Sequence, residues 1–227
     1  MSGNLGIKLY NFENIIFYVD PINSNLSEIK NKTDGTLNGS TNVGNSILFN
    51  GTSNFISFPF YTGIQSNVVT IDCWIKPSSA GLDSVLFSIF DWENFMMGLE
   101  SRGYALTWSS NTFKFSYGVG NTGANQVRTS SVVSTLNKWC NIIVTNNLGI
   151  TTFYLNGSLL STIGTNTNKA LDWTYASGTL SDITISRMNN IVNGYFSGNI
   201  GPIKVYNKVL TPSEINTNYN QLKSRFV

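Results

Sequence analysis

Apolar and aromatic residues recur in short runs along the whole chain, and clusters of Gly, Asn and Ser separate the runs. Many short runs with turn signals between them predict an all-β sandwich or barrel. Asn156-Gly157 is a strong signal for a two-residue hairpin. The expected strands are 14–20, 47–49, 55–60, 68–76, 84–91, 95–100, 104–108, 113–117, 126–133, 138–146, 150–155, 158–163, 183–186 and 200–209.

One helix is well specified, near the C-terminus. Residues 211–214, Thr-Pro-Ser-Glu, form a capping box in which Thr211 is the N-cap and Glu214 reaches back to its amide. The next turns carry one apolar stripe, made of Ile215, Tyr219 and Leu222. A helix this short is marginal alone, so we expect residues 211–224 to dock on the sandwich.

Length and composition favour a single domain with few charged residues on its surface. The 227 residues are 41% hydrophobic, which is enough for one sizeable core. No repeat or linker divides them, so we expect a single domain over 1–227, with 1–13 as an N-terminal arm. Only 11% of the residues are charged, against about 25% in an average soluble domain. The surface must therefore be mostly Asn, Ser, Thr and Gly.

The charge and the apolar pattern also limit the partners. A net charge of +2 gives no strong field, which argues against nucleic acid and acidic membranes. No apolar stretch is long enough to insert into a membrane. The first residues show no basic segment followed by an apolar one, so we expect no secretory signal peptide.

The chain has no His, which removes Ser-His-Asp and Cys-His catalysis and the commonest metal ligand. The two cysteines, Cys73 and Cys140, each lie beside a Trp in an apolar run. We expect buried free thiols, with a disulfide as the alternative. Two Cys without His cannot form a zinc site.

Five segments, in chain order, resemble the laminin-G-like jelly-roll family, which shares the concanavalin A-like architecture. They are ILFNG…NFI (47–56), VTIDCWIKP (69–77), KWCNIIVT (138–145), TFYLNG (152–157) and YFSGNI…VYNKVLT (195–211). The resemblance runs from about residue 47 to the C-terminus. It implies a two-sheet antiparallel jelly-roll sandwich with one short C-terminal helix.

The two ends carry a narrower resemblance. IFYVDPINS (16–24) and EINTNYN…KSRF (214–226) are similar to the opening and closing segments of tailed-bacteriophage virion proteins of this fold. This resemblance implies a virion component on the particle surface, assembled in the host cytoplasm and packed on other virion subunits.

Glycoside hydrolases share this architecture and need two carboxylates that flank the scissile bond. The related glucanases carry them as E-x-D-x-x-E on one strand face, and no acidic residue here repeats that pattern. Asp91, Glu93 and Glu100 come nearest, but Glu100 is too far from Glu93. We therefore expect no catalytic residues and no enzyme activity.

Calcium is the usual cofactor of the family. The family's Asp in the closing strand aligns with Gly201, and the Asp of its opening segment is Asn50. Both changes remove a negative charge from a site where calcium would need several oxygen ligands. We expect no metal or other cofactor, and the alternative is a calcium site on Asp20, Asn50 and backbone carbonyls.

Aromatic residues divide into two groups. Trp74 and Trp139 occupy core positions of the family pattern. Loop-type composition concentrates in 91–94, 118–126 and 166–175, and loops at the rim of a scaffold are where binding groups usually sit. Aromatic faces stack on sugar rings and amides bind hydroxyls; the alternative is that these side chains cover the ends of the sandwich. The candidate ligand-binding residues are Trp92, Asn121, Asn125, Gln126, Trp173 and Tyr175.

These features predict a non-catalytic virion protein with a lectin-like sandwich that adheres to host surface glycans. Recognition by stacking and neutral hydrogen bonds should depend little on salt. The alternatives are a purely structural virion subunit, a non-viral lectin or adhesin, and a degenerate glycoside hydrolase. The chain lacks coiled-coil heptads, so any homo-oligomer must form through the sandwich itself.

Overall fold

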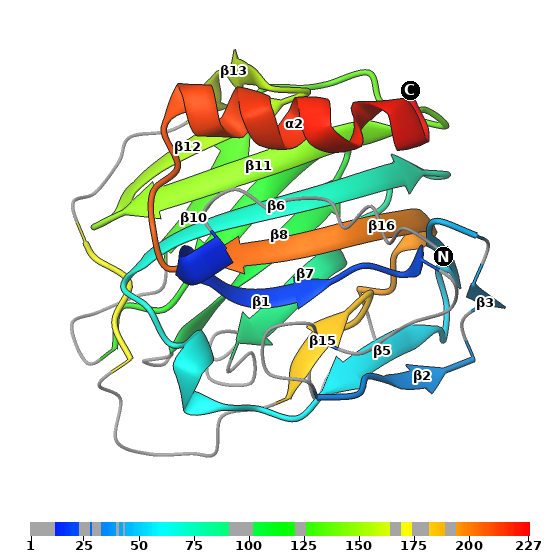
Figure 1. Ribbon diagram of the computed structural model, residues 1–227, viewed down its shortest axis with the longest axis horizontal. Coiled ribbons are helices and arrows are strands. Elements are labelled where there is room, and N and C mark those ends of the chain that lie inside the picture. Colours follow the sequence, from blue (N-terminus) through cyan, green and yellow to red (C-terminus); the bar gives the residue numbers. More distant parts are fainter. Residues whose placement is uncertain are drawn as a thin grey trace, which may run out of the picture.

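The structure is a computed structural model in which two antiparallel β-sheets lie face to face, with a helix on the outer face of one of them (Figure 1). It describes residues 12–22, 28, 33–39, 41–42, 44–90, 102–120, 126–163, 169–173, 182–188 and 194–227. This arrangement confirms the two-sheet jelly-roll sandwich with a C-terminal helix.

The strands fall into a helix-covered sheet and an opposite sheet. The helix-covered sheet has the order β13 (Ser158–Leu160), β12 (Ile150–Leu155), β11 (Cys140–Asn147), β6 (Val68–Pro77), β16 (Ser197–Tyr206), β4 (Ile47–Asn50) and β3 (Thr41–Asn42), and β1 (Ile15–Val19) also pairs with β16. The opposite sheet has the order β14 (Thr162–Ile163), β10 (Gln126–Ser130), β9 (Thr112–Tyr117), β8 (Gly103–Ser109), β7 (Ser84–Phe90), β15 (Ile183–Ile185), β5 (Phe55–Phe58) and β2 (Thr36–Asn38). Two short 3-10 turns, η1 (Phe12–Asn14) and η3 (Thr62–Ile64), precede β1 and β6.

The backbone crosses from one sheet to the other at both edges of the sandwich. The predicted strand 158–163 is in fact two strands, because β13 belongs to the helix-covered sheet and β14 to the opposite one. Between them the Ser161 carbonyl accepts from the Ser131 amide at 2.7 Å, which draws the chain toward β10. At the other edge the chain passes from β2 in the opposite sheet to β3 in the helix-covered sheet. Neither strand was predicted. The expected strand 95–100 lies outside the described residues.

β1 lies along the second half of β16, and side chains occupy its other side. The register pairs Phe17 with Val205. On the free side, the Tyr18 amide donates to a Glu28 carboxylate oxygen at 2.7 Å, and the Tyr61 hydroxyl donates to the carbonyl of Ile16. The edge of β1 is therefore closed without another strand.

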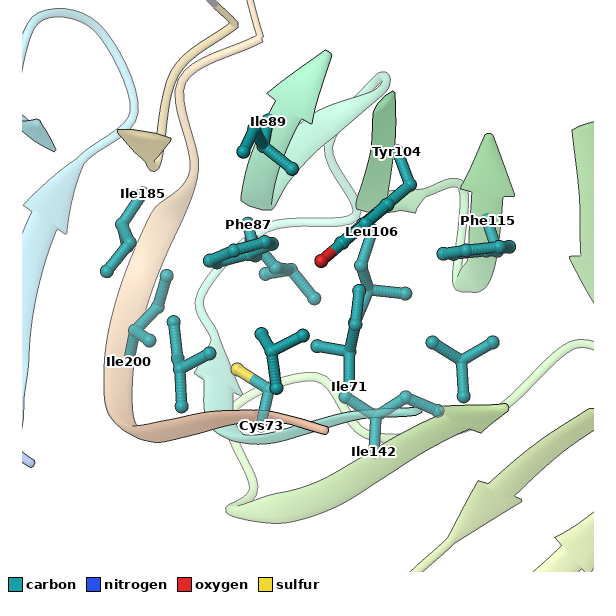
Figure 2. Packing of buried hydrophobic residues seen from close by; sticks show 14 of the residues in the cluster. Ile71, Cys73, Phe87, Ile89, Tyr104, Leu106, Phe115, Ile142, Ile185 and Ile200 are labelled. Atoms are coloured by element: carbon teal, nitrogen blue, oxygen red, sulfur yellow. The ribbon is translucent and has the colours of Figure 1, made fainter. Parts of the chain in front are cut away.

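The core lies between the sheets, where inward-facing side chains alternate along each strand. Figure 2 shows Ile71 and Cys73 of β6 directed toward Phe87 of β7 and Leu106 of β8, and all four are fully buried. Cys73 and Cys140 are both buried, free thiols, as predicted.

The helix α2 (Pro212–Phe226) begins at the predicted capping box. The Thr211 hydroxyl accepts from the Glu214 amide at 3.3 Å, and the Glu214 carboxylate accepts from the Thr211 amide at 2.8 Å. Ile215 and Leu222 of the predicted stripe are buried against the helix-covered sheet. In the described parts of the chain, every helix is too short or too polar to cross a membrane.

Aromatic rings fasten the helix to the sheet. Trp74 of β6 stacks on Tyr219 with centroids 5.6 Å apart, and on Phe226 with centroids 4.8 Å apart. Phe226 also contacts Trp139 at 4.6 Å. Gly201 lies close beneath this stack, because a Cβ there would be 3.0 Å from Cζ of Phe226 and the ring would have to shift. The position that carries an Asp in the family thus serves packing here.

A polar cluster is buried beside these rings. The carboxylate of Asp72 lies 3.7 Å from Nζ of Lys204, and their side chains are only 3% and 2% exposed. Asp72 also accepts from the side-chain amides of Asn141 at 2.7 Å and Asn218 at 3.2 Å. Asn218 donates in addition to the Tyr206 hydroxyl at 2.8 Å. The ion pair is thus part of the contact between β6, β11, β16 and the helix.

Candidate functional site

A cavity of about 590 Å³ opens at one end of the sandwich. Three segments far apart in the sequence enclose it: the β4–β5 turn, the β6–β7 loop and the entry to β16. Its lining is small and uncharged, and consists of Gly51, Thr52, Ser79, Gly81, Leu82, Ser84, Gly194, Tyr195 and Ser197. We call this space the end cavity.

Asn50 builds the first wall of the end cavity. Its side-chain oxygen accepts from the amides of Thr52, Ser53 and Asn54, at 3.0, 2.9 and 3.1 Å. The turn also requires glycine at position 51, where φ is +78° and a Cβ would lie 2.9 Å from that of Ser197. The Asn-Gly pair therefore presses this turn against the start of β16.

Backbone carbonyls anchor the second and third walls to the opposite sheet. The Ser79 carbonyl accepts from the Trp108 indole at 2.9 Å, and the Gly81 carbonyl accepts from the Ser110 amide at 3.2 Å. The Gly194 carbonyl accepts from the Val85 amide at 2.7 Å. These bonds fix the shape of the end cavity from three sides.

The lining determines what the end cavity can hold. Thr52, Ser79 and Ser197 bring hydroxyls, while Leu82 and Tyr195 bring apolar surface. Leu82 is 80% exposed, although large aliphatic side chains are usually buried. The nearest charge in the loop, Asp83, is paired with Lys114 at 2.7 Å. A neutral, polyhydroxylated ligand matches these groups, and Tyr195 is the one titratable side chain of this lining, so an acid and a base are not paired in it.

The three loops predicted to bind ligand begin at the opposite end of the sandwich. β7 starts at the end cavity with Ser84 and ends with Phe90, where the first loop begins. The second and third loops meet at that far end, because Val119 and Asp172 form an isolated bridge and the Asp172 amide donates to the Gly118 carbonyl at 3.1 Å. The structure therefore brings those two loops together, away from the end cavity.

Among the predicted residues, Trp173 and Gln126 are described. The indole of Trp173, which is half-buried, donates to the Ser66 carbonyl at 3.0 Å, and its ring meets Tyr104 edge-on at 5.8 Å. Gln126 accepts from the Arg128 guanidinium at 3.2 Å. Both have structural partners, and their part in ligand binding stays a prediction. Four predicted residues lie outside the described residues, namely Trp92, Asn121, Asn125 and Tyr175.

Sequence reasoning missed the end cavity because it looked for aromatic loops. The lining is mostly Gly, Ser and Thr, which also make ordinary turns. The one available signal was Leu82, an apolar residue inside the loop that follows Pro77.

Both side chains of the alternative calcium site, Asp20 and Asn50, have protein partners in the structure. Arg225 donates two hydrogen bonds to the Asp20 carboxylate, at 2.8 and 2.9 Å, and the side-chain oxygen of Asn50 is filled by backbone amides. The described residues contain no cluster of three or more His, Cys, Asp or Glu side chains that could hold a metal ion. Asp91, Glu93 and Glu100 lie outside the described residues, so the absence of catalysis stays a prediction.

Residues 50–216 match the model of a family described as the concanavalin A-like lectin/glucanases superfamily. No curated protein sequence matches the chain.

The fold is similar to solved binding domains of botulinum neurotoxins. For serotype G the TM-score is 0.69 at 15% identity, covering 93% of this chain and 52% of that one. For serotype DC in complex with rat synaptotagmin II it is 0.67 at 19% identity, with coverage of 92% and 52%. For type C, whose cell entry depends upon interaction with two ganglioside molecules, it is 0.66 at 16% identity, with coverage of 92% and 51%. This chain spans about half the length of these structures, and identities this low show the fold alone.

Proposed function

The chain belongs to the concanavalin A-like lectin/glucanases superfamily, and from that premise we propose that it is a non-catalytic binding module that holds an uncharged glycan in the end cavity. The observation that carries the proposal is the lining of hydroxyls, Tyr195 and Leu82 without a charged side chain. Sugars bind by stacking one apolar face and by hydrogen bonds to their hydroxyls, and this lining offers both.

Two further observations support glycan binding. The neurotoxin binding domains of similar fold include one whose cell entry uses gangliosides, which are glycan-bearing lipids. The end cavity is also preformed, because Asn50, Trp108 and Val85 fix its three walls through hydrogen bonds. A preformed site loses little ordering entropy on binding.

The proposal predicts that Leu82→Ala and Tyr195→Ala each weaken glycan binding about tenfold, through loss of apolar contact with the sugar ring. A neutral glycan array identifies the ligand, and titration of the full chain gives the affinities. Binding should change little between about 0.1 M and about 1 M salt, because no charge takes part.

Leu159→Ala is the matched control, since Leu159 is a similarly exposed leucine (71%) on β13, outside the end cavity. It should bind like the parent. Parent-like binding by both cavity variants would place the site elsewhere, and the loops that carry Trp92 and Trp173 would be tested next.

We propose further that the module is a virion component, exposed on a bacteriophage particle and packed on other virion subunits. The support is the resemblance of segments 16–24 and 214–226 to tailed-bacteriophage virion proteins. These two segments are joined in the structure, since Arg225 of the second donates two hydrogen bonds to the Asp20 carboxylate of the first.

Mass spectrometry of purified particles checks this assignment, and the expected result is the chain in stoichiometric amounts. Particles that lack the chain, from a lysate that contains it, would contradict the virion proposal and leave glycan binding standing. Incorporation without binding to any glycan would instead favour the purely structural subunit.

A further inference from the structure

A second, smaller pocket of about 300 Å³ lies on the helix-covered face. It is enclosed by the entry to β4, the end of β6, the start of β16, the residue before β11 and the last turn of α2. Its lining consists of Asn45, Ser46, Lys76, Trp139, Asn199, Arg225 and Phe226. The volume is at the lower limit of known ligand sites, which suits a single sugar ring.

The pocket differs from the end cavity in its charge. Arg225 is neutralised by Asp20, at 2.8 and 2.9 Å. The Lys76 side chain makes no ion pair or hydrogen bond with the described residues, whereas Lys114, Lys204 and Lys208 are paired with carboxylates. The lining contains no carboxylate, so Lys76 supplies a free positive charge at a partly enclosed position.

The remaining lining matches a sugar ring. The half-buried rings of Trp139 and Phe226 pack on each other with centroids 4.6 Å apart, and the surface that the pocket exposes is almost wholly polar. The Asn199 amide donates to the Ser46 hydroxyl at 3.2 Å, so its oxygen and the Ser46 proton stay available to a ligand. One cation with amides and a hydroxyl fits a sugar carboxylate and its neighbouring hydroxyls, whereas a nucleic-acid backbone would require several clustered cations.

The pocket and the end cavity are neighbours along β16. Ser197 lines the end cavity and Asn199 lines the pocket, two residues or about 7 Å further on. Lys76 is the register partner of Asn199 on β6. A short oligosaccharide can therefore reach both spaces.

From this geometry we propose that the pocket binds the carboxylate-bearing sugar of an acidic glycan, with Lys76 as the counter-charge and the neutral sugars in the end cavity. The inference rests on the proposed glycan binding and names the class of glycan. A charge-assisted hydrogen bond of this kind should favour the acidic glycan about tenfold over its neutral counterpart.

The experiment titrates the full chain with pairs of oligosaccharides that differ only in one terminal acidic sugar, one pair with a sialic acid and one with a uronic acid. The parent should prefer the acidic member of at least one pair, and salt should reduce that preference. Lys76→Gln should abolish the preference and keep the affinity for the neutral member.

Lys138→Gln is the matched control, because Lys138 is exposed and adjacent to Trp139 but does not line the pocket. It should keep the preference. Equal binding of acidic and neutral members by the parent, or an undiminished preference in Lys76→Gln, overturns this inference and leaves the proposed function intact. Failure to bind any member of either pair overturns both.

Discussion

Raising the pH from about 9 to about 11 should lower the free energy of unfolding by several kcal/mol. Burial raises the pKa of three phenols, those of Tyr18, Tyr104 and Tyr206, and of two thiols, those of Cys73 and Cys140. The pKa of Cys140 rises to about 12. The carboxylate of Asp72 raises the pKa values of Cys73, Tyr18 and Tyr206 further, and the Tyr61 phenol raises that of Tyr104.

The sign follows from proton linkage. In the unfolded chain these groups ionise near their ordinary pKa values, about 8.5 for Cys and about 10 for Tyr. Above those values the unfolded chain releases protons that the folded chain keeps, so unfolding becomes easier. The stabilisation is fully present below about pH 8.5 and falls by about 1.4 kcal/mol per pH unit for each group that has begun to ionise.

Urea unfolding at a series of pH values measures this loss. Tyr206→Phe removes one ionising group and should reduce the slope above about pH 10 by about 1.4 kcal/mol per unit. A stability that stays constant from pH 9 to 11 would contradict the prediction.

Replacing Asp72 with Asn should lower the free energy of unfolding by about 3–5 kcal/mol. The change keeps the shape of the side chain but leaves the Lys204 ammonium buried without its counter-charge, 3.7 Å away. It also replaces a carboxylate that accepts from Asn141 and Asn218. Chemical denaturation of the parent and the variant gives the difference.

Two variants test the cause. Adding Lys204→Met to Asp72→Asn should recover most of the loss, because the unpaired charge is then gone. Asp83→Asn breaks the ion pair between Asp83 and Lys114, whose side chains are 55% and 31% exposed respectively. Because this pair is exposed, the change should lower the free energy of unfolding by less than about 1 kcal/mol. If Asp72→Asn and Asp83→Asn lowered the free energy of unfolding equally, burial of the Asp72–Lys204 pair would not explain the cost.

Local signals predicted most of the fold. The capping box at Thr211 and the Asn156-Gly157 turn are formed by residues adjacent in sequence, and both residues of that turn have positive φ, as its two-residue type requires. The crossings at the sandwich edges were missed, because β2 and β3 are short and polar. The division of 158–163 depends on Ser131, far away in the sequence.

The candidate site was harder to predict for the same reason. Its walls meet only through contacts between distant segments, such as Gly51 against Ser197 and Trp108 with Ser79. Lys76 appears in the sequence as an ordinary residue at the end of a strand. Its proposed role depends on the absence of a carboxylate partner among the described residues, which no sequence pattern identifies.

The crossed edges of the sandwich bear on how such a module can join a larger assembly. Growth of a shared sheet by strand addition needs a long row of free backbone donors and acceptors at an edge. In the residues described, the four terminal strands of the two sheets are each two or three residues long, and Glu28 and Tyr61 occupy the free side of β1. A neighbour must therefore recognise side-chain surface, and the chain gains protection against templated aggregation.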